Sequence, residues 1–393
     1  MQHLDFNLDR HLSPSLKWGK YRGQDIIPAW VADMDIASPA VVIEAMMERL
    51  RQHPIMGYER PSDGTYGAIQ DYLQDFHGWT VEREAIVFLP GLVPAINWCC
   101  AMAGEAGDEI LVPSPIYPPF LSAPGNQSRA CIQLPHRRQG DGWEMDFEAW
   151  ESLVSPRSRA LLFCHPHNPL GRWWRDDELS AVIEFCQRHD LLLVSDEIHC
   201  QLLLEDRQQQ PAFRSTATLS PWARAHSITL LAPSKTYNIP GMACAYAVIE
   251  EPSLRSRFLR ACAGCIPELT PLSYIACETA YRQGEPWRQE MLALLRQNWQ
   301  SVQAALAGWP LIRSNLMEAT YLAWLDVRAL GLKRPHASFE AGGVGLGDGK
   351  AFGDGDYLRL NFATSPERLA EILSRMDRVI ADAPGHQRAS LSQ

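Results

Sequence analysis

Lys235 is the residue of this chain whose surroundings point most strongly to chemistry. It stands in Ser-Ile-Thr-Leu-Leu-Ala-Pro-Ser-Lys-Thr-Tyr-Asn-Ile-Pro-Gly-Met, residues 227–242, where an apolar run gives way to Asn, Pro and Gly. A lysine at the end of a buried strand is partly desolvated, which lowers its pKa and frees its amine to attack a carbonyl. A lone lysine in a turn is more often a surface residue, so the chemical interpretation depends on what else lines the same edge.

Two other charged residues stand in or beside apolar runs and therefore need partners of opposite charge. Asp196 follows the run Leu191–Ser195, and a carboxylate at the end of a buried strand is costly unless a cation pairs with it. Arg359 lies within Tyr-Leu-Arg-Leu-Asn-Phe-Ala, and its planar fork suits a carboxylate. A helix-capping aspartate and an internal salt bridge are the alternatives when each is taken alone.

Three further strand ends carry residues suited to a small ligand. Gly91 permits a tight turn before a helix, whose free backbone amides would hold a phosphate. Prolines around Tyr117 would present its ring as a stacking platform. Asn168, at a turn bounded by proline, offers both a donor and an acceptor. An ordinary βα turn and a rigid structural loop are equally good accounts of Gly91 and Tyr117 in isolation.

Short apolar runs alternate with helix-like stretches, which predicts an α/β fold with a mostly parallel sheet. The predicted strands are Ala85–Leu89, Glu109–Val112, Arg159–Cys164, Leu191–Ser195, Ser227–Leu231 and Ala245–Ile249. The predicted helices are Pro94–Ala103, Asp146–Leu153, Asp176–His189, Leu254–Cys262 and a long stretch over Ser273–Leu306. A smaller α+β domain is predicted from strands Tyr321–Val327 and Tyr357–Phe362 and a final helix from Pro366. Because open α/β sheets bind ligands outside the carboxyl ends of their strands, the residues above are expected to meet there.

Two glycine-rich or polar stretches predict loops. Gly342–Gly349 fits neither phosphate-loop template, so a flexible loop is expected there. The polar tail after Ala383 is expected to fray.

Composition limits the partners of the chain. It has 393 residues, 46% of them hydrophobic, and a formal net charge of −10, so we expect a large core and no binding to nucleic acid. The acidic N-terminal segment and the lack of a long apolar run predict a cytoplasmic protein that does not enter a membrane. Cys262 and Cys265 form a lone Cys-x-x-Cys motif, and no metal site is expected.

The order of these features resembles that of fold-type I enzymes that use pyridoxal 5′-phosphate, the aminotransferase class I/II superfamily. Trp-Val-Ala-Asp-Met-Asp at residues 30–35 and Asp-Glu-Ile-His at residues 196–199 are similar to motifs of one subgroup, the MalY/PatB-type C–S lyases or cystathionine β-lyases. The resemblance implies an N-terminal segment 1–45 that contributes to a small domain, a large cofactor-binding domain 46–284 and a C-terminal small domain 285–393.

The resemblance also implies the role of each site residue. Lys235 would carry the cofactor and remove the substrate Cα proton, Asp196 would keep the ring nitrogen protonated, and Arg359 would bind the α-carboxylate with help from backbone near Ala32. The cofactor contacts implied by the family are Gly91, Leu92, Val93, Tyr117, Asn168, Asp196, His199, Ser234, Lys235 and, in the neighbouring subunit of a homodimer, Tyr58. Many relatives have phosphate-binding Ser and Arg where this chain has Ala232 and Ala243, so the phosphate would depend on the amides, Ser234 and Tyr58.

Three functions follow from the resemblance. The first is a C–S β-lyase that cleaves cystathionine or related cysteine S-conjugates to a thiol, pyruvate and ammonia. The second is an aminotransferase, because both reactions begin with loss of the Cα proton. The third is a cofactor-binding regulatory protein, which the presence of Lys235, Asp196 and Arg359 argues against.

Overall fold

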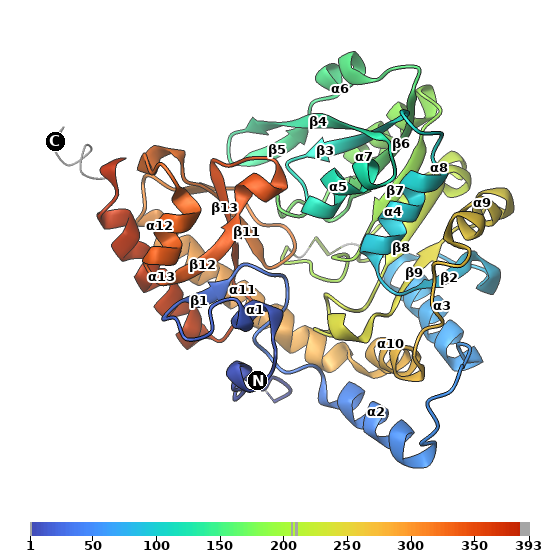
Figure 1. The fold of residues 1–393 in the computed structure, drawn as a ribbon, viewed down its shortest axis with the longest axis horizontal. Coiled ribbons are helices and arrows are strands. Elements are labelled where there is room, and N and C mark those ends of the chain that lie inside the picture. Colours follow the sequence, from blue (N-terminus) through green and yellow to red (C-terminus); the bar gives the residue numbers. More distant parts are fainter. Residues whose placement is uncertain (1, 206, 209–210, 386–393) are drawn as a thin grey trace.

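The computed structural model describes residues 2–205, 207–208 and 211–385 and contains two sheets (Figure 1). The larger sheet has eight strands in the order β2-β9-β8-β7-β6-β3-β4-β5. Its strands are β2 (Ile86–Leu89), β3 (Glu109–Ser114), β4 (Ala130–Gln139), β5 (Gly142–Met145), β6 (Ser158–Cys164), β7 (Leu192–Asp196), β8 (Ser227–Leu231) and β9 (Ala245–Val248). Most of the predicted tail after Ala383 lies outside the described residues.

The central strands of the larger sheet run parallel. β4, β3, β6, β7 and β8 pair in parallel, whereas β9 is antiparallel to its neighbours β8 and β2, and β5 is antiparallel to β4. Parallel neighbours end at the same edge, so the turns after β3, β6, β7 and β8 are brought side by side. The predicted α/β fold with a mostly parallel sheet is confirmed.

Helices cover both faces of this sheet. Along β6, Leu161 and Phe163 pack into one cluster with α7, whereas Leu162 and Cys164 pack into another with α4 and α5. This alternation explains why the strand is apolar throughout, since side chains of a strand point to opposite faces in turn. The helices around the larger sheet are α3 (Asp63–His77), α4 (Leu92–Met102), α5 (Pro118–Asn126), α6 (Phe147–Leu153), α7 (Asp176–Arg188), α8 (Pro221–His226), α9 (Pro252–Cys262) and α10 (Pro271–Gln283).

The smaller sheet combines both ends of the chain. Its order is β1-β12-β13-β11-β10, with bounds β1 (Ile27–Ala29), β10 (Arg313–Ser314), β11 (Leu322–Asp326), β12 (Val344–Asp348) and β13 (Tyr357–Asn361). The remaining helices are α1 (Leu16–Gly19), α2 (Ala40–Gln52), α11 (Glu285–Ala307), α12 (Pro335–Ala341) and α13 (Pro366–Ala381). Short 3₁₀ turns lie at Arg10–Leu12, Arg83–Ala85, Thr216–Thr218, Pro240–Met242, Arg328–Leu330 and Gly349–Phe352.

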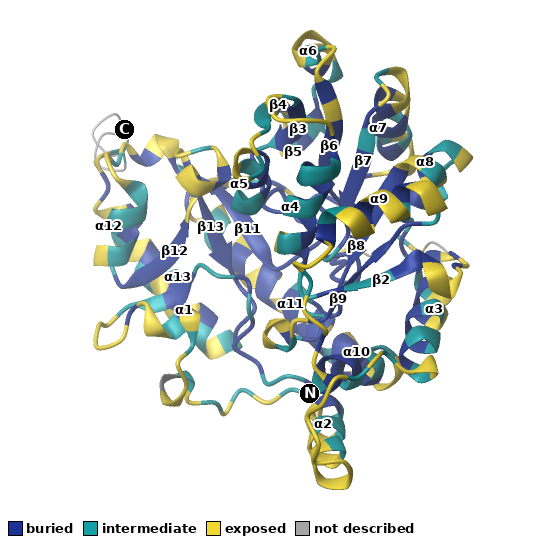
Figure 2. Ribbon diagram, turned by 45° about the vertical axis from the view of Figure 1, so that its right-hand side comes forward, coloured by how far each residue is buried: buried dark blue, intermediate teal, exposed yellow. Residues whose placement is uncertain are grey.

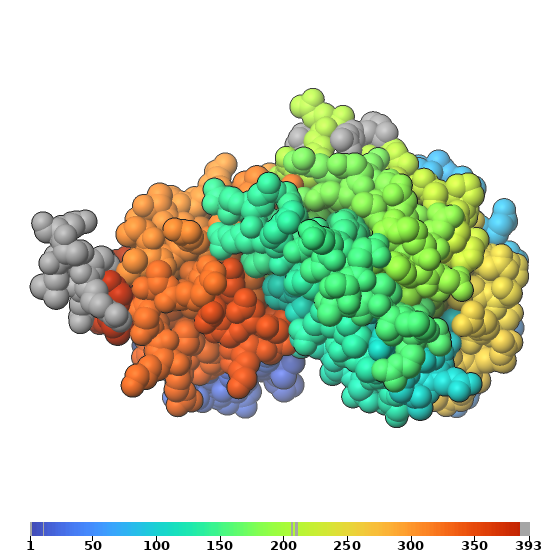
Figure 3. Space-filling view, turned by 90° about the horizontal axis from the view of Figure 1, so that it is seen from above, coloured from blue at the N-terminus to red at the C-terminus, as the bar shows by residue number. Residues whose placement is uncertain are grey.

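The two sheets lie in adjacent parts of the molecule. Figure 3 shows the C-terminal part, in orange and red, beside residues of the central part in green. Buried residues fill both parts, and α2 projects from the molecule with much of its surface exposed (Figure 2). No helix among the described residues is long and apolar enough to cross a membrane.

Two sequence predictions about regular structure are wrong. The long helical stretch is two helices, α10 and α11, which meet at Gly284, where a Cβ would collide with the ring of Tyr237 and the carbonyl of Ala280. The predicted loop Gly342–Gly349 is mostly strand β12, which pairs with β1 and β13. Glycines suit this strand because its neighbours approach closely: a Cβ on Gly347 would lie 3.2 Å from Cβ of Arg359.

Candidate active site

The predicted site residues of the larger sheet meet at the carboxyl edge of its parallel strands. Tyr117 follows β3, Asn168 follows β6, Asp196 ends β7 and Lys235 follows β8. Arg359 comes from β13 of the smaller sheet and contacts Asn168. The site is therefore built from residues of both sheets, which lie in adjacent parts of the molecule (Figure 1).

Lys235 sits in a tight turn directly after β8. Backbone bonds from Tyr237 to Pro233 and from Ile239 to Ser234 close this turn at 2.9 and 3.0 Å. The amine Nζ donates to the carbonyl of Ala32 at 2.8 Å. Burial, helped by the charge of Arg359, lowers the pKa of Lys235 to about 8, although the charges of Asp33 and Asp196 act to raise it. A much larger fraction of this amine than of an ordinary lysine is therefore neutral near pH 7 and can act as nucleophile or base.

Asp196 is a buried carboxylate without a cation in contact. Its Oδ1 accepts a bond from the backbone N–H of Ile198 at 3.1 Å, and no ion pair to it occurs among the described residues. Burial raises the pKa of Asp196 to about 7. A cation delivered to this carboxylate would restore its charged form.

The neighbouring Glu197 points into a different environment. Its Oε1 accepts bonds from Ser195 at 2.9 Å, Ser215 at 3.1 Å and the N–H of Thr216 at 3.0 Å. Glu197 therefore anchors the 215–216 segment, a structural role that the sequence motif did not reveal.

Arg359 is a buried cation that contacts no carboxylate among residues described by the structure. Nη1 donates to Oδ1 of Asn168 at 3.0 Å and Nη2 to the carbonyl of Trp30 at 2.7 Å. Nε is buried without an acceptor, and the guanidinium carbon lies 4.5 Å from the centre of the Phe352 ring. Burial lowers the pKa of Arg359 to about 10. Because a buried guanidinium is stabilised by a carboxylate, this side chain is suited to bind one from a ligand.

Asn168 and Tyr117 are held together by their backbones. The N–H of Tyr117 donates to the carbonyl of Asn168 at 3.1 Å. Burial raises the pKa of the Tyr117 hydroxyl. The charge of Arg359 lowers this pKa, and the charge of Asp196 raises it. The ring therefore lies within reach of both charges. Within the part of the chain that is described, the amide NH2 of Asn168 has no protein acceptor, so it can donate to a ligand.

His199 is a buried neutral imidazole. Burial, together with the charges of Lys235 and Arg359, lowers its pKa to about 3. Its Nδ1 has no hydrogen-bond partner among the described residues, and its ring packs edge-on against Tyr321 at 6.5 Å. The charge state of His199 is thus fixed while one polar atom stays available.

Helix α4 begins two residues earlier than predicted, at Leu92 instead of Pro94. Gly91 precedes the helix, so the N–H groups of Leu92 and Val93 have no acceptor within it. The helix follows β2, which runs parallel to β8, and its first turn therefore opens at the same edge as Lys235. Free amides at a helix N-terminus form a site for an anion.

The last two predicted residues, Ala32 and Tyr58, lie in different places. Ala32 contributes its carbonyl, which accepts bonds from Lys235 and from the hydroxyl of Tyr321 at 3.2 Å. Tyr58 lies in the segment between α2 and α3, and its side chain is 96% exposed. Within one chain, Tyr58 is therefore not part of the cluster.

Sequence reasoning missed three polar contacts that shape the site. Trp30 provides a carbonyl to Arg359, Tyr321 provides a hydroxyl to Ala32, and Asn361 donates to two carbonyls of the segment that contains Ala32. Only Asn361 had a usable signal, because it stands two residues from Arg359 on one strand and so shares a face with it.

Comparisons with known proteins give a consistent result. Residues 31–376 match the model of the aminotransferase class I and II family. Cystathionine beta-lyase PatB of Bacillus subtilis (strain 168) is 33% identical over 96% of this chain and 100% of its own length. The crystal structure of OvoB is similar with a TM-score of 0.93 and 37% identity, over 96% of this chain and 98% of that chain. Cystalysin from Treponema denticola, whose crystal structure contains pyridoxal 5′-phosphate, has a TM-score of 0.91 and 30% identity over 96% and 99% of the two chains.

The fold and its similarity to cofactor-containing structures define a fold-type I enzyme that uses pyridoxal 5′-phosphate. The chain belongs to the aminotransferase class I and II family. The predicted likeness to MalY/PatB-type cystathionine β-lyases is confirmed. The residues present fit the cofactor: Asp196 lacks a cation, the first amides of α4 lack acceptors, and Nε of Arg359 lacks an anion.

Proposed function

We propose that this protein is a C–S β-lyase that cleaves cystathionine or related cysteine S-conjugates to a thiol, pyruvate and ammonia. The observation that carries this proposal is the proximity of a low-pKa amine, Lys235, to the buried guanidinium of Arg359, which has no carboxylate in contact with it. Together they suit an amino acid whose Cα proton is to be removed. Lyase rather than transaminase is supported by the full-length likeness to cystathionine beta-lyase PatB.

Arg359 would bind the substrate α-carboxylate. Nε is free, and both terminal nitrogens would still have hydrogens left beyond those given to Asn168 and Trp30. The guanidinium is fixed by these two bonds and by the ring of Phe352, so a carboxylate would meet an already oriented partner. Binding at Arg359 places the substrate Cα toward the turn that carries Lys235.

Lys235 would hold the cofactor covalently between turnovers and take the Cα proton on its released amine. Bound pyridoxal phosphate supplies an electron sink for the electron pair left when the Cα–H bond breaks. The carbonyl of Ala32, 2.8 Å from Nζ, would orient the amine for this proton transfer. The substrate C–S bond then breaks, its electron pair leaves with the thiolate, and water releases pyruvate and ammonia from the remaining fragment.

The other predicted residues would bind and orient the cofactor. Asp196 would pair with the protonated ring nitrogen, and the NH2 of Asn168 would donate to the 3-oxygen beside His199. Tyr117 would stack on the ring. The phosphate would be bound by amides of Gly91, Leu92 and Val93 with the hydroxyl of Ser234, as expected for a helix N-terminus. For this small-molecule enzyme, the cytoplasm is the compartment that we propose.

The lyase and the aminotransferase differ in one requirement: only the aminotransferase needs a keto acid to accept the amino group. The purified protein, loaded with pyridoxal phosphate, would be incubated with L-cystathionine and no keto acid, and pyruvate and homocysteine would be measured. Equal amounts of both products support the lyase, and a Lys235→Ala variant serves as the inactive control. Turnover only after a keto acid is added would identify an aminotransferase instead. No turnover of any amino acid tested would favour the regulatory candidate.

We also propose that the enzyme is a homodimer whose active site includes Tyr58 of the neighbouring subunit. Apolar side chains are exposed along one face of α2 and in the segment that follows it, as expected for a subunit interface. Their exposed fractions are Ile43 41%, Met47 45%, Leu50 41%, Ile55 77%, Met56 50% and Tyr58 96%.

Mixed dimers test the sharing of the site. Lys235→Ala and Tyr58→Ala subunits, each inactive or nearly so alone, would be unfolded, mixed and refolded together. If Tyr58 acts in the neighbouring subunit, each hybrid regains one intact site and activity returns. If Tyr58 acts within its own subunit, or not at all, mixing restores nothing. Sedimentation of the wild type at several concentrations would confirm or reject the dimer separately.

A further inference from the structure

Residues 30–36, called here the 30–36 segment, are held in place by side chains from distant parts of the chain. The segment follows β1 and forms neither helix nor strand. Each carbonyl from residue 30 to residue 34 accepts a hydrogen bond from a side chain, as does that of Ile36. The donors are Arg10, Lys17, Lys235, Asn238, Tyr321, Arg359 and Asn361.

Two of these donors are the reactive groups of the site. Lys235 donates to Ala32 at 2.8 Å, and Arg359 donates to Trp30 at 2.7 Å. The 30–36 segment therefore joins the amine that would take the proton to the guanidinium that would bind the carboxylate.

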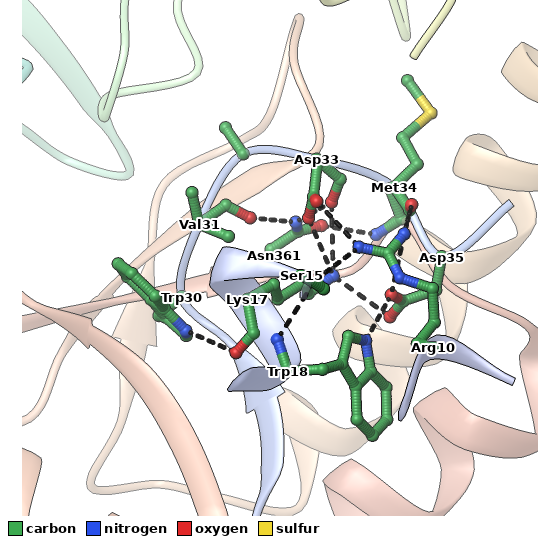
Figure 4. A network of polar contacts seen from close by, with 12 residues as sticks. Arg10, Ser15, Lys17, Trp18, Trp30, Val31, Asp33, Met34, Asp35 and Asn361 are labelled. Atoms are coloured by element: carbon green, nitrogen blue, oxygen red, sulfur yellow. Dashed lines mark hydrogen bonds and ion pairs between the residues drawn. The ribbon is translucent and has the colours of Figure 1, made fainter. Parts of the chain in front are cut away.

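The two asparagines hold the segment from positions adjacent to those reactive groups. Asn361, two residues from Arg359 on β13, donates to Val31 at 2.7 Å and to Asp33 at 2.8 Å (Figure 4). Its Oδ1 accepts from the N–H of Ala363 at 2.9 Å, so the side chain cannot rotate without losing three bonds. The residue is buried.

Asn238, three residues after Lys235, holds the segment in the same way as Asn361. Its NH2 donates to Met34 at 3.1 Å and Ile36 at 2.8 Å, and its Oδ1 accepts from the N–H of Met34 at 3.0 Å. Its φ of 53° lies in the left-handed region, which asparagine tolerates better than most residues.

A charged cluster also holds the segment. Lys17 lies 3.0 Å from Asp35 and donates to the carbonyl of Asp33 at 3.2 Å, while Arg10 pairs with Asp33 at 2.8 Å (Figure 4). Lys17 and Asp35 are both buried. The segment is thus held both by the two asparagines and by this charged cluster.

We infer that Asn361 and Asn238 are positioning residues that hold the 30–36 segment so that one rigid element sets the places of the Lys235 amine and the Arg359 guanidinium. This inference rests on the proposed function, because the Lys235 amine and the Arg359 guanidinium are the two groups that would act on the amino-acid substrate. The segment also contacts the Lys235 amine directly, through the carbonyl of Ala32. Removing either asparagine would let the segment move and water reach the amine.

The experiment measures the environment of Lys235 without turnover. The full chain, free of cofactor, would be acylated with a trace of acetic anhydride across a pH series, and labelling of Lys235 would be followed by peptide mass spectrometry. Charged groups that act on this amine are Arg359, Asp33 and Asp196, and all are left unchanged. In the wild type, labelling of Lys235 should be half-maximal near the pKa of about 8.

Asn361→Ala and Asn238→Gly are the test variants, and glycine is chosen because it tolerates the positive φ. Burial is the main cause of the low pKa of Lys235, so water entry should raise it by about 1 pH unit in both variants. Asn298→Ala is the matched control. Asn298 is equally buried and donates to the carbonyls of Phe362 and Thr364 at 2.9 and 2.8 Å, outside the 30–36 segment.

The inference predicts a shift in both test variants and none in Asn298→Ala, with thermal melting recorded for all three. An unchanged labelling curve in the test variants would overturn it, and so would an equal shift in Asn298→Ala, since the effect would then be general loosening. If one test variant fails to fold, the labelling curve of the other still tests the inference. Because no substrate is turned over, this result does not depend on whether the enzyme is a lyase.

Discussion

Arg359 and Asn168 are joined by a hydrogen bond from Nη1 to Oδ1 of 3.0 Å, which links strand β13 to the turn after β6. Since Arg359 can only donate, the amide oxygen of Asn168 must face it, and the NH2 group must face elsewhere. This bond therefore sets the orientation of the amide that would contact the cofactor. It also connects the group that would bind the substrate to the group that would bind the cofactor.

Asn168→Asp tests this link. The new carboxylate would pair with Arg359 in place of the substrate and would offer no N–H to the cofactor. We expect KM for the amino-acid substrate to rise about 10- to 100-fold, as is usual when a charged hydrogen bond is lost, with a changed visible spectrum of the bound cofactor. Steady-state kinetics would measure the first effect. The exposed Asn126→Asp on α5 is the control, and an unchanged KM in Asn168→Asp would contradict the role given to this bond.

Asp196→Asn should stabilise the cofactor-free protein at high pH while weakening cofactor binding. The pKa of Asp196 is raised from 3.8 to about 7, so the folded protein keeps a proton that the unfolded chain has already released. Stability of the cofactor-free form therefore falls as pH rises from about 4 to about 7. The side-chain amide of the Asp196→Asn variant does not titrate, so this loss of stability disappears. Its oxygen can still accept the hydrogen bond from the N–H of Ile198.

Urea denaturation near pH 5 and pH 8 would check this prediction. The gain in unfolding free energy should be larger at pH 8, up to about 4 kcal/mol from the size of the pKa change. A gain that is the same at both pH values, or a loss at pH 8, would contradict it. Cofactor titration of the same variant should give a raised Kd.

Glu318→Ala should strongly destabilise the fold. Glu318 is buried and accepts bonds from Arg172 at 2.8 Å, Arg207 at 3.1 Å and the N–H of Trp173 at 2.9 Å. Removing it leaves two guanidinium groups short of a partner, at a cost of about 3 kcal/mol in unfolding free energy. Chemical denaturation would measure this. The control is Asp63→Ala, whose exposed pair with Arg83 should contribute nothing measurable; equal effects of both substitutions would contradict the prediction.

Much of the site could be predicted because side-chain chemistry at strand ends is visible in sequence. Asp196 ends an apolar strand and Asn168 and Lys235 each follow one, and parallel pairing brings such ends together. The predicted roles of these residues stay proposals until the experiments above are done. So do the boundaries 1–45, 46–284 and 285–393, which limited proteolysis would test.

The helix break, strand β12 and the backbone contacts of the site could not be predicted, because they depend on packing between residues far apart in the sequence. Nothing near Gly284 in the sequence shows that the ring of Tyr237 lies against it. Strand β12 was not recognised because its glycines, which leave space for Arg359 and Tyr21, are typical of loops. The carbonyls of Trp30 and Ala32 carry no side-chain signal at all, since any residue has one. Their partners became visible only when the fold placed them together.

The central claim is that Lys235 carries the cofactor. The chain has five lysines, namely Lys17, Lys20, Lys235, Lys333 and Lys350, so the attachment point can be mapped without ambiguity. The protein would be loaded with pyridoxal phosphate, reduced with borohydride, digested and analysed by mass spectrometry. We expect the added pyridoxyl phosphate on the peptide that contains Lys235 and on no other. Label on a different lysine, or a wild type that takes up no cofactor, would contradict it.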